Sequence, residues 1–256
     1  MVENLLRKKL AAGATTVGVF IADTRDVFVV KLAANAALDF IVVDMEHGPI
    51  GLETASTLCQ FARAAGVTPI VRVPSPSYEA MCPLLDAGAQ GLILPRMKSA
   101  EDVRRAVDCC LYPPQGQRGA ISVKGHSDYR PFDVASFLPE TNDEIMILPQ
   151  VELVEALECL DEFLDVPGIS GVLVGPSDLS ISMGIPGQMD HPQEVAAIEQ
   201  VIEGCKKRNL VRAIAILPHE RLVGWGEKGM NMLCAGSETY ILDDGFRTIR
   251  GLVPTA

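Results

Sequence analysis

Short apolar runs alternate along the chain with longer stretches in which apolar residues recur at helical spacing. The runs are built from Val, Ile, Leu and Ala and lack the regular polar alternation of a half-exposed strand. Runs of this kind are typical of parallel strands that are covered on both faces. We predict eight such strands, at Thr15–Ile21, Phe40–Asp44, Thr68–Val73, Gly91–Pro95, Glu144–Gln150, Gly171–Gly175, Val211–Leu217 and Gly229–Ala235.

The segments between these runs have the pattern of amphipathic helices. Gly66 and Gly88 each follow such a segment directly, and a glycine there supplies the left-handed conformation that closes a helix. We predict an amphipathic helix within residues 1–13 and further helices at Leu52–Ala65, Tyr78–Ala87, Ala100–Cys110, Leu153–Leu164 and His191–Arg208.

Eight strand–helix units favour a closed (β/α)8 barrel, whereas six or fewer would favour an open, doubly wound sheet. The 256 residues suit one barrel of this kind, and no shift in composition marks a second domain. We therefore expect an α/β protein with a single TIM-barrel domain over residues 1–256. One long irregular connection, Pro113–Glu140, interrupts the pattern, and a loop of that length is more often functional or interfacial than idle.

The composition of the chain limits the kinds of partner and cofactor that it can bind. The net charge of −11 disfavours binding to nucleic acid or to an anionic membrane surface. The start of the chain has no apolar signal-peptide core, and no apolar run is long enough to span a membrane, so we expect a cytoplasmic protein. The seven cysteines form no CxxC pair or Cys/His zinc spacing, which indicates reduced structural thiols. Neither a dinucleotide fingerprint nor a GxxxxGK[ST] loop is present, so no nucleotide cofactor is expected.

Polar residues gather where the predicted strands end. In barrels of this kind the active site is assembled from the carboxyl ends of the strands, so side chains from several strands should meet at one mouth. The polar strand ends are Asp44-Met45-Glu46-His47-Gly48-Pro49, Arg72-Val73-Pro74, Gln150-Val151-Glu152 and Gly175-Pro176-Ser177-Asp178.

Glu152 and Asp178 are the candidate metal ligands. Two carboxylates, with the other positions left to water and substrate, suit a hard octahedral cation such as Mg²⁺ or Mn²⁺. Each acid taken alone could equally cap the helix after its strand, because Asp and Glu are common there. Their occurrence at two adjacent strand ends favours the metal site.

Other residues at the same ends suggest catalysis and substrate binding. His47 lies close to Asp44 and Glu46, and an imidazole can move a proton in either direction near neutral pH. Arg72 ends an apolar strand, where a guanidinium needs an anionic partner. That partner is a substrate carboxylate or enolate oxygen, or else Glu46 or Glu152 in an ion pair. The neighbouring Gln150 and the helix start Gly175-Pro176-Ser177 are candidates to bind a substrate carboxylate.

The same residues resemble the HpcH/HpaI aldolase family, the metal-dependent pyruvate aldolases related to macrophomate synthase. Each motif is weak alone, but their ordered occurrence at suitable strand ends is a strong signal. They run through most of the chain: VVDMEHGP, VRVP, LLDAGAQGLILP, YPPQGQRG, QVE and GPSDLS.

This resemblance implies roles for particular residues. Glu152 and Asp178 would hold a divalent cation, Mg²⁺, Mn²⁺ or Co²⁺, which the keto oxygen and carboxylate of a 2-oxo acid would chelate. Arg72 would steady the keto oxygen, and His47, assisted by Asp86 of LLDAGAQ, would transfer protons. Asp44 and Glu46 would supply polar surroundings. The family pattern also implies a homo-oligomer, typically a hexamer of dimers that exchange a C-terminal helix, here the segment Tyr240–Leu252.

The implied reaction is the retro-aldol cleavage of a 4-hydroxy-2-oxo acid to pyruvate and an aldehyde. The electron pair left on C3 delocalises as pyruvate enolate, whose oxyanion the metal and Arg72 would stabilise. Oxaloacetate decarboxylation, or trapping of the enolate as in macrophomate synthase, would use the same enolate and is the alternative. A barrel that only binds a metabolite is a third reading, which the intact set of charged residues disfavours. No lysine occupies a strand end in these motifs, so a Schiff base is not expected.

The chain departs from the family pattern at three motif positions and in the long loop 120–130, which does not match bacterial members. Leu153 follows the candidate ligand Glu152 where Thr is common, Arg96-Met97 alters the end of the fourth strand, and Cys234–Glu238 alters the last motif. We expect these positions to lie where the aldehyde half of the substrate binds.

Overall fold

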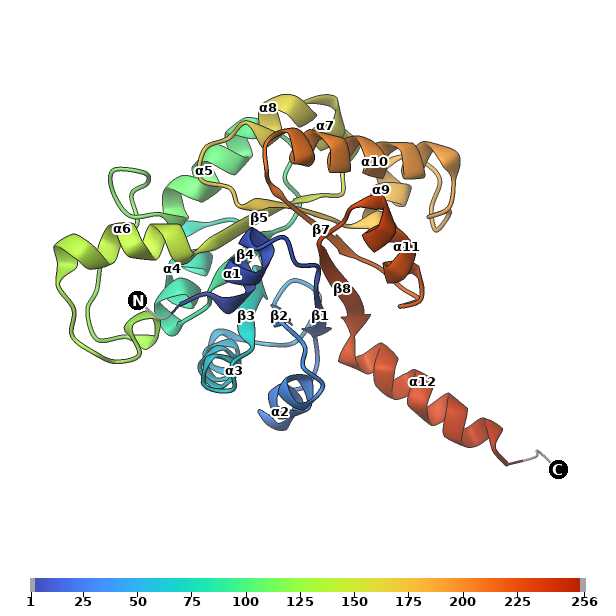
Figure 1. Ribbon diagram of the computed structural model, residues 1–256, viewed down its shortest axis with the longest axis horizontal. Helices are drawn as coiled ribbons and strands as arrows, with labels where there is room; N and C mark the ends of the chain where they lie inside the picture. The colour runs from blue at the N-terminus through green and yellow to red at the C-terminus, as the bar shows by residue number, and fades with distance from the viewer. Residues whose placement is uncertain (1–2, 254–256) are drawn as a thin grey trace.

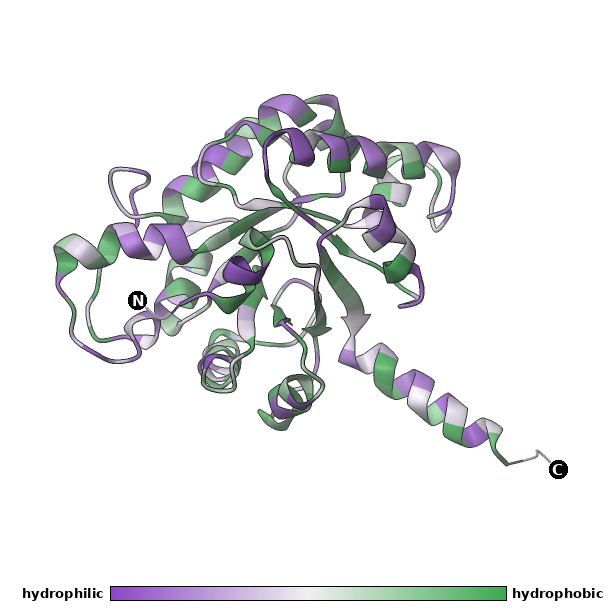
Figure 2. Cartoon of the chain, viewed as in Figure 1, coloured by the Kyte–Doolittle hydropathy of each residue, from purple (hydrophilic) through white to green (hydrophobic). Residues whose placement is uncertain are grey.

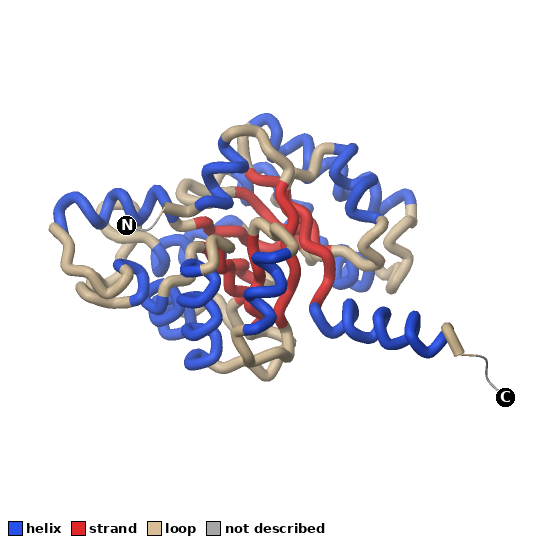
Figure 3. The backbone as a smooth tube through the Cα atoms, turned by 60° about the horizontal axis from the view of Figure 1, so that its bottom comes forward, coloured by secondary structure: helices blue, strands red, loops and turns tan. Residues whose placement is uncertain are grey.

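Eight apolar segments form strands that pair in the order of the sequence, and β8 pairs with β1 to close a parallel barrel (Figures 1 and 3). This computed structural model describes residues 3–253. The closed barrel predicted from the alternation of strands and helices is confirmed. Its strands are β1 (Thr16–Ile21), β2 (Phe40–Asp44), β3 (Thr68–Arg72), β4 (Gly91–Leu94), β5 (Met146–Val151), β6 (Gly171–Val174), β7 (Val211–Ala215) and β8 (Met232–Ser237).

Helices surround the barrel, as the ring of blue segments around the red strands in Figure 3 shows. They are α1 (Leu5–Ala11), α2 (Phe28–Asn35), α3 (Leu52–Ala64), α4 (Tyr78–Ala87), α5 (Ala100–Cys110), α6 (Val134–Glu144), α7 (Val154–Glu158), α8 (Leu160–Leu164), α9 (Pro176–Ser182), α10 (Pro192–Lys207), α11 (Arg221–Lys228) and α12 (Glu238–Gly251), together with the 3-10 turn η1 (Gly125–Ser127).

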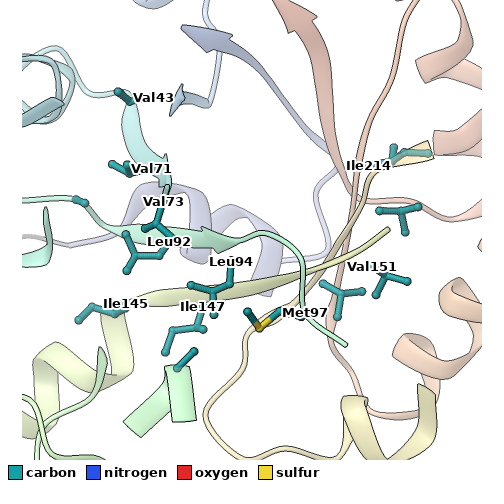
Figure 4. Packing of buried hydrophobic residues seen from close by; sticks show 14 of the residues in the cluster. Val43, Val71, Val73, Leu92, Leu94, Met97, Ile145, Ile147, Val151 and Ile214 are labelled. Carbon is teal, nitrogen blue, oxygen red and sulfur yellow. The ribbon is translucent and has the colours of Figure 1, made fainter. Parts of the chain in front are cut away.

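Two apolar layers hold the barrel together. The outer layer lies between strands and helices. It contains strand residues such as Val43, Val71 and Ile147 (Figure 4) together with helical residues such as Leu58 and Val103. The inner layer fills the barrel itself with Phe40, Met146 and other side chains of the opposite strand faces. Strands are therefore apolar on both faces, whereas the covering helices alternate between polar and apolar residues (Figure 2).

Helix α1 closes the end of the barrel at which the strands begin. Leu6 and Leu10 are buried in the same cluster as the inner barrel residues. Asn4 caps the helix by accepting the N–H of Arg7, and its side-chain amide donates to the backbone oxygens of Gln90 and Glu144 at 3.0 and 2.9 Å. Because this end is covered, the open mouth lies where the strands end.

Several predicted strand boundaries were wrong by a few residues. The largest error is at the start of the last strand. The predicted segment Gly229–Ala235 starts three residues too early, since β8 begins at Met232. Gly229 instead takes a left-handed φ of 112° and closes α11 with bonds to Gly226 and Trp225. The fifth strand likewise begins at Met146 rather than Glu144, which is the last residue of α6.

Some helices differ from the prediction as well. The segment Leu153–Leu164 is two short helices, which Cys159 separates with φ −114° and ψ 28°. The last part of the long connection Pro113–Glu140 is helical rather than irregular. Asp133 accepts the N–H of Ser136 there and starts α6. The short helices α2, α9 and α11 were not predicted. The predicted N-terminal helix is present as α1, with residues 1 and 2 outside the described part.

Helix α12 extends away from the barrel (Figures 1 and 3). Glu238 is its one buried residue among those described, whereas large apolar side chains along the helix are exposed. These are Tyr240, Ile241, Leu242, Phe246, Ile249 and Leu252. Within residues 3–253, no helix is both long enough and apolar enough to span a bilayer. All seven cysteines are free thiols.

Candidate active site

The polar strand ends meet at the mouth of the barrel. Asp44 ends β2 and Arg72 ends β3, and the two are register partners on neighbouring strands. Glu152 directly follows β5, and Gly175 follows β6 and begins α9. The sequence-based prediction that these segments converge on one end of the barrel is therefore confirmed.

A buried ion pair between Asp44 and Arg72 forms one side of the mouth. Arg72 Nε donates to Asp44 Oδ1 at 2.9 Å and Nη2 donates to Oδ2 at 2.6 Å. Burial alone would raise the pKa of Asp44, but the bonds and charge of Arg72 outweigh that effect and lower it. The guanidinium also lies 4.7 Å from the ring centroid of Phe20. The anionic partner that Arg72 needs within the chain is thus first Asp44, which the sequence did not indicate.

Glu46 lies between Arg72 and His47. Its Oε2 is 3.3 Å from Arg72 Nη1 and 3.7 Å from His47 Nε2, and it has no hydrogen-bond partner among the described residues. Burial raises the pKa of Glu46, and the nearby positive charge of Arg72 only partly opposes the rise. The imidazole of His47 is 62% exposed and faces the mouth, while its backbone N–H is 3.4 Å from Asp44 Oδ1. A partly buried carboxylate with a raised pKa therefore stands beside an accessible imidazole.

Glu152 forms the other side of the mouth and is almost fully buried. Its Oε1 accepts the backbone N–H of Arg96 at 2.6 Å, and its Oε2 accepts from the side chain of Gln150. Burial raises the pKa of Glu152, the N–H of Arg96 opposes this, and the charges of Glu46 and Asp178 add to the rise. The carboxylates of Glu46, Glu152 and Asp178 thus lie close enough to repel one another.

Gly175 lets the helix start approach these side chains. A Cβ built on Gly175 would lie 2.7 Å from Gln150 Nε2 and 3.2 Å from Glu152 Oε2, so a larger residue does not fit without displacing them. The N–H of Gly175 is already bonded to Val151 O at 3.2 Å, and Pro176 has no N–H. The expectation that this segment offers backbone donors to a carboxylate therefore narrows to the N–H groups from Ser177 onward.

The charges of the mouth suit a divalent cation. Four carboxylates, those of Asp44, Glu46, Glu152 and Asp178, accompany the two guanidinium groups of Arg72 and Arg96, which leaves an excess of two negative charges. No three His, Cys, Asp or Glu side chains in residues 3–253 gather closely enough to form a metal site by themselves. Glu152 and Asp178 fit an octahedral ion that keeps its other positions for water and substrate. The buried Gln150 Oε1, which lacks a partner among the described residues, offers a further oxygen nearby.

Arg96 belongs to this site, although it was not among the predicted site residues. It lies just beyond β4 and has a φ of 60°, a left-handed conformation that costs a non-glycine residue about 1–2 kcal/mol. Its N–H holds Glu152, and its Nη1 is 3.7 Å from Asp178 Oδ1. The available signal in the sequence is a charged residue next to the strand end, at a position that departs from the family pattern.

Within one chain Asp86 lies away from His47, so the assistance expected of it stays a prediction. Helix α4 follows β3 at the mouth and returns to the start of β4, which places Asp86 near the opposite end of the barrel. There its Oδ1 accepts from Arg118 Nη2 at 2.6 Å, and its backbone oxygen is 3.3 Å from His126 Nδ1. Arg118 is buried, with its guanidinium 4.6 Å from the ring centroid of Tyr112. In one chain Asp86 therefore fixes the long connection after α5.

Glu238, in the altered last motif, also supports the mouth. Its carboxylate accepts the backbone N–H groups of Ala22, Asp23 and Thr24 at 2.8 to 3.0 Å. Burial opposes ionisation, but these N–H donors outweigh it and lower the pKa of Glu238. The connection after β1 is thereby held at the mouth.

A cavity of about 800 Å³ lies at the other end of the barrel, beside α1. Leu10, Ile145, Ser170 and Arg212 are among its lining residues. Arg212 donates to the backbone oxygens of Gly229 and Leu210, so its guanidinium is already engaged there. The convergent carboxylates, imidazole and guanidinium groups are at the mouth, which is therefore the candidate active site.

A barrel with this arrangement at its mouth is that of a carbon–carbon lyase acting on oxo acids, and comparison with known proteins agrees. The family model of HpcH/HpaI aldolase/citrate lyase matches residues 16–242, and the chain belongs to this family. A 4-hydroxy-2-oxo-heptane-1,7-dioate aldolase of Escherichia coli is 32% identical over 240 residues, which cover 94% of this chain and 91% of that protein.

Two further proteins are similar over nearly the whole chain. A 2-keto-3-deoxy-L-rhamnonate aldolase of Escherichia coli O9:H4 (strain HS) is 30% identical over 247 residues, with 95% of this chain and 91% of that protein covered. The crystal structure of an HpcH/HpaI aldolase from Desulfitobacterium hafniense DCB-2 superposes with a TM-score of 0.92 at 33% identity, covering 98% of each chain.

Proposed function

We propose that this protein is a class II pyruvate aldolase that cleaves a 4-hydroxy-2-oxo acid to pyruvate and an aldehyde. The observation that carries the proposal is the excess of two negative charges at the mouth, where the charge of Asp178 adds to the raised pKa of Glu152. The relatives support the reaction class, because both similar enzymes from Escherichia coli are named as aldolases of such acids.

Glu152 and Asp178 would hold the divalent cation, Mg²⁺, Mn²⁺ or Co²⁺. When bound, this ion supplies a Lewis acid for the keto oxygen and carboxylate of the 2-oxo acid. Gln150 and the N–H groups from Ser177 onward orient the carboxylate end of the substrate. Gly175 keeps that helix start close enough for them to act together.

Arg72 stabilises the charge that develops on the keto oxygen. A guanidinium has five N–H groups. Asp44 occupies one on Nε and one on Nη2, and Glu46 faces Nη1. The remaining N–H groups of Nη1 and Nη2 are left for substrate, and the fixed ion pair means that they need no reorganisation when the oxyanion forms.

His47 moves the protons. In cleavage it takes the proton of the 4-hydroxyl group, the bond between C3 and C4 breaks, and its electron pair delocalises onto the keto oxygen. The proton then returns to C3 and completes pyruvate. Glu46, 3.7 Å from His47 Nε2, orients the imidazole and balances the charge that it acquires.

The test is release of pyruvate from a 4-hydroxy-2-oxo acid after treatment with EDTA and after return of Mg²⁺, Mn²⁺ or Co²⁺. We expect activity to disappear with EDTA and to return with metal. Glu152→Gln and Asp178→Asn should each weaken Mn²⁺ binding in calorimetry on the order of 100-fold. The matched control is Glu155→Gln, an exposed carboxylate nearby that pairs with Lys98 and should leave binding unchanged.

Oxaloacetate distinguishes the alternative. Pyruvate and CO₂ from oxaloacetate, with no cleavage of the hydroxy acid, would make the protein a decarboxylase with the same residue roles. Absence of pyruvate from either substrate with every metal would contradict the proposal.

We also propose that the protein is a homo-oligomer in which α12 packs against another copy. The support is the row of exposed apolar side chains on a helix that leaves the barrel. Water contact along that face is unfavourable, and a second subunit would remove it. The family resemblance implies a hexamer, which light scattering would test.

A further inference from the structure

Arg96 is the cation of the mouth that has no firm partner. Arg72 is bonded to Asp44 and faces Glu46, and Lys98 pairs with Glu155 at 3.4 Å. The guanidinium of Arg96 makes no hydrogen bond within residues 3–253, and its one ion pair there is the long contact of 3.7 Å with Asp178. Its side chain is 57% exposed, so it can move without disturbing the core.

The backbone of Arg96, in contrast, is fixed. The 2.6 Å bond from its N–H to Glu152 Oε1 holds the residue at a φ of 60°. Non-glycine residues in this conformation are costly and gather at functional sites. The result is a side chain that starts beside Glu152 and reaches towards Asp178.

A cation held by Glu152 and Asp178 would change the position of this side chain. A guanidinium next to an ion of the same sign is repelled, and the weak contact with Asp178 offers little resistance. The side chain would then turn to the open mouth, beyond the group that binds the pyruvate half. There its guanidinium would be left without a carboxylate partner from residues 3–253.

We propose that Arg96 is a specificity-determining residue that binds a carboxylate on the aldehyde half of the substrate. The preferred substrates are accordingly 4-hydroxy-2-oxo dicarboxylic acids, whose cleavage gives a semialdehyde with a terminal carboxylate. A planar guanidinium matches a carboxylate with two parallel hydrogen bonds, which a neutral sugar-like chain cannot form. This inference rests on the proposed function, because it assumes that the pyruvate half binds at Glu152 and Asp178.

Equilibrium binding tests the inference without turnover. Protein loaded with Mn²⁺ is titrated by calorimetry with 2-oxoadipate and with 2-oxohexanoate, which differ only in the terminal carboxylate. For the wild type we expect 2-oxoadipate to bind about 10- to 100-fold more tightly, the range of a charge-assisted hydrogen bond. Arg96→Met should abolish this difference, and Arg96→Lys should keep part of it. Arg104→Met, which removes an exposed arginine of α5, should retain the wild-type ratio.

Two further measurements separate the possible outcomes. Aldol addition of pyruvate to succinic semialdehyde and to butanal should show a ratio of kcat/KM that favours the anionic aldehyde and falls in Arg96→Met. Titration with Mn²⁺ alone should show that this variant binds the metal at least as tightly as the wild type. A loss of Mn²⁺ affinity would mean that Arg96 supports the ligands instead, and would overturn the inference.

Equal binding of the two oxo acids by the wild type, or an unchanged preference in Arg96→Met, would also overturn it. Both outcomes would leave the aldolase proposal standing, because each oxo acid would still bind. If neither oxo acid binds in the presence of Mn²⁺, the proposed function fails and the role of Arg96 fails with it.

Discussion

Replacement of Asp44 by Asn would disturb Arg72, Glu46 and His47 together, because all three donate hydrogen bonds to the carboxylate of Asp44. Oδ1 of Asp44 accepts from Arg72 Nε and from the N–H groups of Glu46 and His47, at 2.9, 3.1 and 3.4 Å, while Oδ2 accepts from Arg72 Nη2 at 2.6 Å. An amide has one oxygen, so in either orientation its NH₂ faces an N–H donor. Asp44→Asn therefore breaks a buried ion pair and leaves the guanidinium short of an acceptor.

The size of the effect follows from burial. Asp44 is 3% exposed and the side chain of Arg72 is 12% exposed. Removal of one partner from a buried pair costs about 3–5 kcal/mol, and the remaining amide oxygen keeps the value near the lower end, at about 3 kcal/mol. Because Arg72 and His47 both lose their fixed positions, we expect kcat/KM for pyruvate release to fall about 100-fold.

Urea unfolding at neutral pH and the rate of pyruvate release measure the two effects. The control is Asp165→Asn, since Asp165 binds Arg208 in the same two-bonded way, at 2.6 and 3.1 Å, but at the surface. Solvent screens that pair, so its loss should change stability far less. If Asp44→Asn were as stable as Asp165→Asn and kept full activity, the idea that Asp44 organises the site would be refuted.

Three other changes have distinct expected results. Gly175→Ala puts a methyl group 2.7 Å from Gln150 Nε2 and 3.2 Å from Glu152 Oε2, so Mn²⁺ affinity in calorimetry should fall about 10-fold or more; unchanged affinity would argue against a metal at this site. Glu238→Gln should lower the free energy of unfolding by about 1–3 kcal/mol at pH 7, because a charged acceptor for three N–H groups is lost. Since the folded pKa of Glu238 lies below its ordinary value of 4.5, this contribution is complete above that pH and disappears as the pH falls through the folded pKa; equal differences at pH 3 and pH 7 would contradict it. Phe246→Asp places a charge on the exposed face of α12 and should reduce the mass measured by light scattering, whereas an unchanged mass would exclude this face from the interface.

The barrel could be predicted because its signal is repeated and local. Each buried strand is a run of apolar residues, and the polar residue that ends the run also marks the mouth, as Asp44 and Arg72 show. Short helices gave weaker signals. Helix α9 has only seven residues and starts at Pro176, so its apolar positions do not complete two turns. Such an element is recognised once its contacts are known.

The partners of the charged residues depend on register, which a single sequence does not show. The expected partner of Arg72 was a substrate anion, with Glu46 or Glu152 as the alternative. Glu46 does lie near Arg72, but the pairing of β2 with β3 sets Asp44 directly opposite it. Residues opposite each other on neighbouring parallel strands point to the same face, so their side chains meet without any motif to announce it.

Asp86 and Arg96 show two cases in which the sequence motifs do not predict whether a residue lies at the mouth. Asp86 lies in a family-like motif, but it is eight positions after Tyr78 at the mouth, a rise of about 12 Å along α4, so its motif does not place it there. Arg96 lies in no matching motif, yet its left-handed backbone brings its N–H to Glu152 and its guanidinium to Asp178. On the proposed assignments, the residues shared with the family would bind the 2-oxo acid, whereas Arg96, which departs from the family pattern, would select what is attached to it.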